Sequence, residues 1–157
     1  MPTRRTILAA SLLLSSLARA QAPSVNVSGM VWQPDNATVR PEGDWQRLGV
    51  NTLLIQWLQT DDGKGHVWRV PALEQLRGQP WAQNIIAGLV GDGDERRARA
   101  NVHALAKASQ ELALQELPFD PVGWYFPVES DPTWTGVNHL ADSLRNLPRP
   151  LWISVYD

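Results

Sequence analysis

The sequence contains no cysteine among its 157 residues. This absence excludes disulfide bonds, thiolate nucleophiles and thiolate metal ligands, so stability must come from a packed core. Histidine is also scarce, because only His66, His103 and His139 occur, and no two of them have the i, i+4 spacing of a helical zinc site. We therefore expect neither a bound metal nor a cofactor.

An excess of charge of either sign is also missing. The chain has 16 acidic and 14 basic residues and a formal net charge of -2. This balance indicates neither a nucleic-acid-binding surface nor an acidic solvating tail. No glycine-rich phosphate motif follows the first expected strand, which counts against a nucleotide-binding fold. The segment GDGDE lacks the downstream glutamate of a calcium loop, so a loop-to-helix turn is the better interpretation.

Long hydrophobic runs are absent as well, since a membrane-spanning helix needs about 20 apolar residues. The short apolar run at 6–17 follows Arg4 and Arg5 and precedes the small-x-small sequence Ala18-Arg19-Ala20. This pattern predicts a signal peptide at 1–20, cleaved after Ala20, and export to the periplasm or beyond. The string TRRTIL is similar to a twin-arginine signal, so both the Sec and the twin-arginine routes remain open. No integral membrane segment is expected after cleavage.

The remaining residues, 21–157, form one predicted domain of alternating strands and helices. Five apolar runs, at 27–34, 50–61, 85–94, 122–130 and 151–157, are typical of buried parallel strands. Helical patterns separate them at 41–49, 71–84, 94–117 and 135–148. Gly49 suits the end of the first helix, Gly78 and Pro80 break the second, and Asp94 can cap the third.

This alternation predicts an α/β fold with a parallel sheet. Two architectures fit it. One is a partial (β/α)8 TIM barrel with about five parallel strands in sequential order, and the other is a five-stranded, doubly wound, flavodoxin-like sheet. The partial barrel is favoured because polar residues follow the strands and because the sequence ends on its fifth strand. Strand order distinguishes the two, since the doubly wound sheet has the order 2-1-3-4-5.

The fourth run, GWYFPVES, leads into Glu129 and then into Trp134. Side chains alternate along a strand, so Glu129 shares a face with Tyr125, while Trp124, Phe126 and Val128 face the helices. A glycosidase needs two carboxyl groups, one of which holds a proton in an apolar or aromatic setting. Glu129 is therefore our candidate general acid, and a solvated acid at the end of a strand is the alternative.

Sugar rings are bound by flat aromatic surfaces and by polar groups that reach their hydroxyls. The expected strand ends and the loops beside them carry such residues. The candidate substrate-binding residues are Trp32, Gln33, Gln56, Trp57, Asp92, Tyr125, Trp134 and Asp157. Packing in the core is the alternative role of each tryptophan, and a merely terminal carboxylate is the alternative for Asp157.

Three segments carry a resemblance to a known family. SGMVWQP, LGVNTLLIQW and GWYFPVESDPTW resemble successive strand ends of a secreted bacterial glycoside-hydrolase-like TIM-barrel family of unknown function, often encoded beside exopolysaccharide genes. The resemblance covers 27–157 and only the N-terminal part of that barrel. It implies an acid/base glutamate at Glu129, although Val128 stands where an asparagine is usual. It also implies a nucleophile on a seventh strand, which lies beyond this sequence.

Three functions follow as expectations. The first is a glycoside hydrolase-like protein that acts on an extracytoplasmic oligosaccharide or polysaccharide and would be inactive alone if the barrel is truncated. The second is a non-catalytic carbohydrate-binding protein that uses the same aromatic cleft. The third is a doubly wound domain that binds an unrelated small ligand.

Overall fold

A computed structural model describes residues 26–34, 41–61, 64 and 66–157. The predicted signal peptide at 1–20 lies outside these residues. No helix in the described part of the chain combines the length and apolarity needed to cross a membrane.

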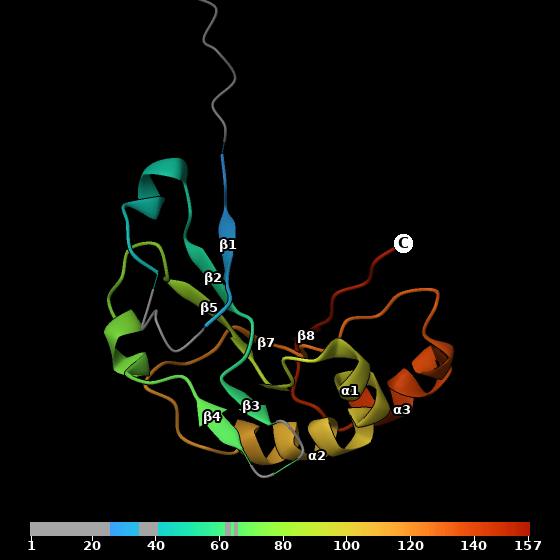
Figure 1. The fold of residues 1–157 in the computed structure, drawn as a ribbon. Coiled ribbons are helices and arrows are strands. Elements are labelled where there is room, and N and C mark those ends of the chain that lie inside the picture. The colour runs from blue at the N-terminus through green and yellow to red at the C-terminus, as the bar shows by residue number, and fades with distance from the viewer. Residues whose placement is uncertain (1–25, 35–40, 62–63, 65) are drawn as a thin grey trace, which may run out of the picture.

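The main sheet has five strands that all run parallel. They are β1 (Gly29–Trp32), β2 (Thr52–Ile55), β5 (Asn84–Gly88), β7 (Gly123–Tyr125) and β8 (Leu151–Trp152). Their order in the sheet, β1-β2-β5-β7-β8, follows their order in the sequence (Figure 1). This confirms the predicted five parallel strands in sequential order and excludes the doubly wound order. Across the described residues the sheet does not close into a barrel.

A second, three-stranded sheet was not predicted. It consists of β3 (Gln59–Asp61), β4 (Val67–Arg69) and β6 (Val90–Gly91), in the order β4-β3-β6. The apolar runs at 50–61 and 85–94, each expected to be one strand, instead begin in the main sheet and then cross into this second sheet. Gly88 lies where β5 ends, and a Cβ atom there would come within 2.3 Å of the Ile55 carbonyl oxygen. The absence of a side chain at Gly88 lets the two departing segments lie this close.

The helices are shorter than the sequence pattern suggests. The expected helix at 94–117 is divided into α1 (Glu95–Ala100) and α2 (Val102–Ala113). Asn101 separates them, and its side chain donates a hydrogen bond to the Arg97 carbonyl. Such local bonds from an asparagine side chain to the backbone compete with the regular hydrogen bonds of a helix. The helix expected at 135–148 is η3 (Thr135–His139) followed by α3 (Leu140–Leu144). Single 3₁₀ turns, η1 (Trp45–Leu48) and η2 (Leu73–Leu76), occupy the two earlier helical stretches.

The core lies between the strands and the α-helices, which gather near β7 and β8 (Figure 1). Leu53 and Ile55 of β2 are completely buried, as are Phe126 and Val128 in the segment after β7. The inner face of α2 supplies Val102, Leu105 and Leu112. Ser109 on the same face is also completely buried, and its hydroxyl accepts a 3.1 Å hydrogen bond from the Val90 backbone N–H. This bond joins α2 to β6.

Candidate functional site

Glu129 lies four residues beyond the end of β7, at the carboxyl edge of the main sheet. The segment after β7 remains beside the segment after β8, because Ser130 forms a parallel bridge with Val155. Glu129 is half-buried, and its Oε1 accepts a 3.2 Å hydrogen bond from the Tyr156 hydroxyl. The carboxyl group is therefore held at the sheet edge.

The predicted alternation along this segment is confirmed. Phe126 and Val128 belong to the core, and Trp124 packs against it. Tyr125 points the other way, as Glu129 does, and its hydroxyl lies 2.7 Å from Ser154 Oγ. Burial raises the pKa of Tyr125, and the nearby charges of Glu129 and Glu95 add to this effect.

The first turns of α1 hold Glu129 through its backbone. Asp94 caps the helix by accepting a 2.9 Å hydrogen bond from the Arg97 N–H. Glu95 then accepts the Glu129 N–H at 3.1 Å, and Arg99 Nε donates to the Glu129 carbonyl at 3.0 Å. Glu95 and Arg99 are also joined to each other at 3.0 Å. Both polar groups of the Glu129 backbone are thus bound by side chains from α1.

Arg99 also fixes the loop that follows Glu129. Its Nη2 donates to Asp131 Oδ2 at 2.6 Å. The other oxygen of Asp131 accepts hydrogen bonds from the backbone N–H and the hydroxyl of Thr133, which is the pattern of an Asx turn. The bonds from Thr133 and then from Arg99 lower the pKa of Asp131 to about 2. Asp131 is therefore a charged structural group and a poor proton donor near neutral pH.

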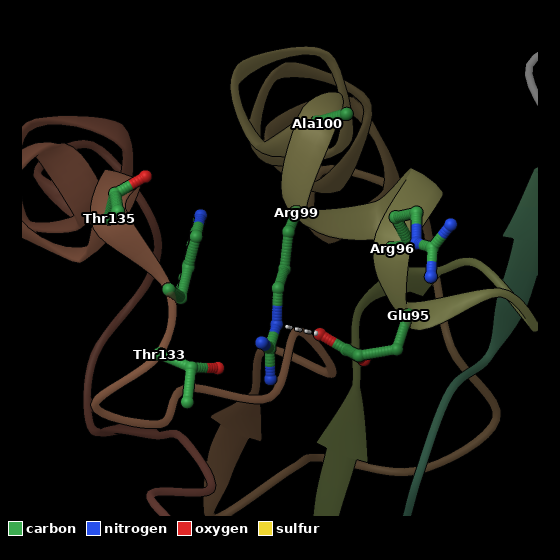
Figure 2. A pocket seen from close by; sticks show the side chains of 7 residues that line it. Glu95, Arg96, Arg99, Ala100, Thr133 and Thr135 are labelled. Carbon is green, nitrogen blue, oxygen red and sulfur yellow. Dashed lines mark hydrogen bonds and ion pairs between the residues drawn. The ribbon is translucent and has the colours of Figure 1, made fainter.

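A depression of about 560 Å³ lies beside this network. Its lining residues are Glu95, Arg96, Arg99, Ala100, Thr133, Trp134 and Thr135. Figure 2 shows the α1 residues on one side, Thr133 and Thr135 on the other, and the Arg99 side chain between them. Trp134 is half-buried, and the Arg99 guanidinium carbon lies 5.7 Å from the centroid of its ring. The depression thus combines an indole, hydroxyl groups and charges of both signs.

Glu95 is the carboxyl group that lines the depression. Burial raises its pKa, while Arg99 opposes this shift through a hydrogen bond and its charge. The charge of Glu129 raises the pKa of Glu95 further, whereas the hydrogen bond from the Glu129 N–H lowers it. The balance of these effects favours the protonated form of Glu95 more than in an exposed glutamate.

The structure brings together only some of the predicted site residues. Glu129, Tyr125 and Trp134 belong to one neighbourhood, as the contacts above show. Trp57 lies close by, since its Cβ and Pro127 both approach Gly91. The Trp57 indole N–H is buried without a hydrogen-bond partner among the described residues.

Two predicted binding residues have other roles. Trp32 is only 6% exposed and lies in the hydrophobic core, so it offers no open ring face for a sugar. Asp92 is 7% exposed, and both of its oxygens are bound by the Arg97 guanidinium, with the Asp94 N–H as a further donor. We therefore correct Trp32 to a packing residue and Asp92 to the residue that shapes the turn into α1. This geometry supports the predicted loop-to-helix turn.

The remaining predicted residues lie on more open surface. Gln33 is exposed just after β1, and Gln56 is half-buried just after β2. Asp157 is exposed. None of these three has a hydrogen bond to Glu129 or lines the depression in the described part of the chain.

Sequence reasoning missed four residues of this neighbourhood: Glu95, Arg99, Asp131 and Tyr156. Three of them carry a recognisable signal. Glu95 and Arg99 have the i, i+4 spacing of a helical ion pair, and Asp131-Pro132-Thr133 has the composition of an Asx turn. Neither signal indicates that α1 contacts the segment after β7. No family model, curated protein or solved structure matches the chain closely enough to indicate a relationship.

Proposed function

We propose that the site around Glu129 and the neighbouring depression binds a carbohydrate and cleaves its glycosidic bond. One observation carries this proposal. The carboxyl group of Glu95 accepts the Glu129 backbone N–H, so both glutamates lie at the carboxyl edge of a parallel sheet, and Glu95 lines a depression that contains an indole and two threonines. Ligand sites of α/β sheets lie at this edge, and glycoside hydrolysis requires a pair of carboxyl groups.

The depression suits a sugar for simple chemical reasons. The Trp134 indole supplies an apolar surface for ring C–H groups, and Thr133 and Thr135 supply hydroxyls that can donate and accept hydrogen bonds. The predicted signal peptide supports an extracytoplasmic polysaccharide as the substrate. Export and the identity of the sugar remain predictions.

The test is to incubate the full chain with a panel of bacterial polysaccharides and oligosaccharides, and to measure both binding and the release of reducing ends. We expect Glu129→Gln to abolish hydrolysis but to retain binding, and Trp134→Ala to weaken binding by about tenfold, the scale of one aromatic contact. Glu111→Gln and Trp45→Ala are matched controls on exposed positions. Absence of hydrolysis across the panel would refute the proposal.

A second candidate is a carbohydrate-binding protein without catalysis. It is favoured by the observation that Glu129 itself is not among the residues that line the depression, while its carboxyl group accepts a hydrogen bond from Tyr156. In that case Trp134→Ala would still weaken binding, but no member of the panel would be hydrolysed and Glu129→Gln would have no effect.

A further inference from the structure

We propose that Glu95 is the proton donor of this site and that Glu129 is the carboxylate with which it works. The inference rests on the proposed glycosidase function and deepens it. The resemblance stated above implies Glu129 as the acid/base and a nucleophile beyond this sequence, whereas here Glu95, the first residue of α1, takes the acid role and Glu129 becomes its partner carboxylate.

The first argument is position. Glu95 lines the depression, and Glu129 does not. The two known donors to Glu95, Arg99 Nε and the Glu129 N–H, both bind Oε1, at 3.0 and 3.1 Å. No hydrogen bond from the described residues reaches Oε2. The carboxyl group is therefore fixed through one oxygen, which leaves the other oxygen to carry and transfer a proton.

The second argument is electrostatic. Burial raises the pKa of Glu95, and the charge of Glu129 acts in the same direction. Arg99 on α1 opposes this shift, but its guanidinium is shared with Asp131. The other charged or titratable groups that surround the pair are Arg96, on the same helix, Tyr125, on β7, and Tyr156, whose hydroxyl donates to Glu129 Oε1. A carboxyl group whose pKa is raised by burial and by a second carboxylate is the arrangement that suits acid catalysis.

The third argument excludes the other nearby acid. Asp131 is bound by Arg99 and Thr133, and these bonds lower its pKa to about 2. Such a group holds no proton near neutral pH. Its place in the Asx turn also commits Oδ1 to Thr133 and Oδ2 to Arg99. Asp131 therefore serves as a positioning residue for the loop, and Glu95 remains the acid that faces the depression.

The proposed step conserves atoms and charge. Glu95 gives the proton on Oε2 to the glycosidic oxygen as the bond from that oxygen to the anomeric carbon breaks. The oxygen of one water molecule bonds to the anomeric carbon, and the proton released by that water returns to the carboxyl pair. The net reaction adds one water molecule across the glycosidic bond, and Glu95 and Glu129 recover their original states.

Kinetics of Glu95→Gln in the full chain test this role, because glutamine keeps an Oε1 acceptor for Arg99 and Glu129 but cannot donate an acid proton. Two substrates are compared: the oligosaccharide that the panel identifies, and the 2,4-dinitrophenyl glycoside of the same sugar. The dinitrophenolate leaves without protonation. We expect kcat to fall by about 10²–10⁴-fold on the oligosaccharide, the usual contribution of an acid–base catalyst, and far less on the dinitrophenyl glycoside. The alkaline limb of the pH profile should also disappear.

Two further variants complete the test. Glu111→Gln, an exposed position on α2, should leave both rates unchanged. Glu95→Asp keeps a carboxyl group, but the shorter side chain moves it away from the glycosidic oxygen. We therefore expect kcat to fall while the alkaline limb of the pH profile remains. Unchanged rates in Glu95→Gln, or an equal loss on both substrates, would overturn the role of Glu95 as proton donor without affecting the proposed function. A panel in which the unmodified chain hydrolyses nothing would overturn both.

Discussion

At the scale of single residues, Arg99 connects every part of the candidate site. It binds the Glu95 carboxyl group, the Glu129 carbonyl and the Asp131 carboxylate, and it lies over the Trp134 ring. The side chain is 19% exposed, so solvent screens these contacts less than it would on an open surface. Loss of Arg99 leaves several partly buried acceptors without a donor.

We therefore expect Arg99→Met to lower the free energy of unfolding by about 1–3 kcal/mol, because unpaired buried polar groups cost about this much. The matched control is Arg145→Met, which removes an i, i+3 ion pair with Asp142 whose arginine is 73% exposed. That change should cost less than about 1 kcal/mol. Urea unfolding of both variants gives the comparison, and equal losses would contradict the central role of Arg99.

The lowered pKa of Asp131 predicts how the stability of the protein depends on pH. Its pKa is about 2 in the folded protein, compared with an ordinary value of 3.8. Between these values the unfolded chain binds a proton that the folded chain does not, so stability falls as the pH decreases. We expect the stability that Asp131 contributes to be fully present above about pH 4 and to be lost as the pH falls towards 2.

The measurement is the free energy of unfolding at a series of pH values, for the unmodified chain and for Asp131→Asn. The variant should lose less stability than the unmodified chain between pH 4 and 2. Asp120→Asn, at an exposed position, is the control and should retain the original slope. Parallel curves for the unmodified chain and Asp131→Asn would show that the interactions of Asp131 with Thr133 and Arg99 do not depress its pKa.

The pKa of Glu95 is shifted in the opposite direction, upwards. The stability that Glu95 contributes therefore weakens as the pH rises above 4.5, the ordinary pKa of a glutamate.

At the scale of elements, the attachment of α2 to β6 depends on one buried polar contact. The Ser109 hydroxyl accepts the Val90 N–H in an environment without exposed surface on either residue. Ser109→Ala would leave that N–H buried and unpaired. We expect a loss of about 1–3 kcal/mol in unfolding free energy, measured by chemical denaturation. Ser28→Ala, at an exposed position, should change stability by less than about 0.5 kcal/mol, and a similarly small effect of Ser109→Ala would show that a water molecule replaces the hydroxyl.

The same elements show what sequence patterns can predict here. Five short apolar runs indicated all five strands of the main sheet. The i, i+4, i+7 spacing of Leu105, Ser109 and Leu112 is typical of one helix face, and all three are buried. The second sheet escaped prediction because β3 and β6 continue the apolar runs of β2 and β5, so no break in either run marks the change of sheet, and because β4 is only three residues long. Hydrophobic periodicity needs a longer window than this to identify a strand.

The candidate site was likewise predictable only in part. Alternation predicted the orientation of Glu129 and Tyr125, because it depends only on local backbone geometry. The contacts of Glu129 with Glu95 and Arg99 join residues 34 and 30 positions apart, and no local pattern encodes them. The sequence left Trp32 as either a core or a sugar-binding residue for a related reason: the side of the sheet that a strand residue faces depends on where the helices pack.

At the scale of the whole molecule, the fold depends on two strands that change sheets. β2 and β5 are neighbours in the main sheet, and the segments that follow them pair again as β3 and β6 in the second sheet. Gly88 lies at this junction, where a Cβ atom would approach the Ile55 and Gln56 carbonyl oxygens to within 2.3 and 2.4 Å. The obstacles are backbone atoms, which cannot move aside as a flexible side chain could.

We therefore expect Gly88→Ala to disturb both sheets together and to lower the free energy of unfolding by about 3 kcal/mol, the upper part of the range for overpacked positions. Gly93→Ala is the matched control, because a Cβ atom there meets no heavy atom within 4 Å and its backbone needs no positive φ. Removing a flexible glycine at such a position leaves stability unchanged or raises it by up to about 1 kcal/mol. Thermal and urea unfolding, followed by tryptophan fluorescence, would give both values. Equal stability of Gly88→Ala and Gly93→Ala would contradict this prediction. It would mean that the two sheets have room to separate at this junction. The close approach of β2 and β5 would then not hold the carboxyl edge of the sheet in place.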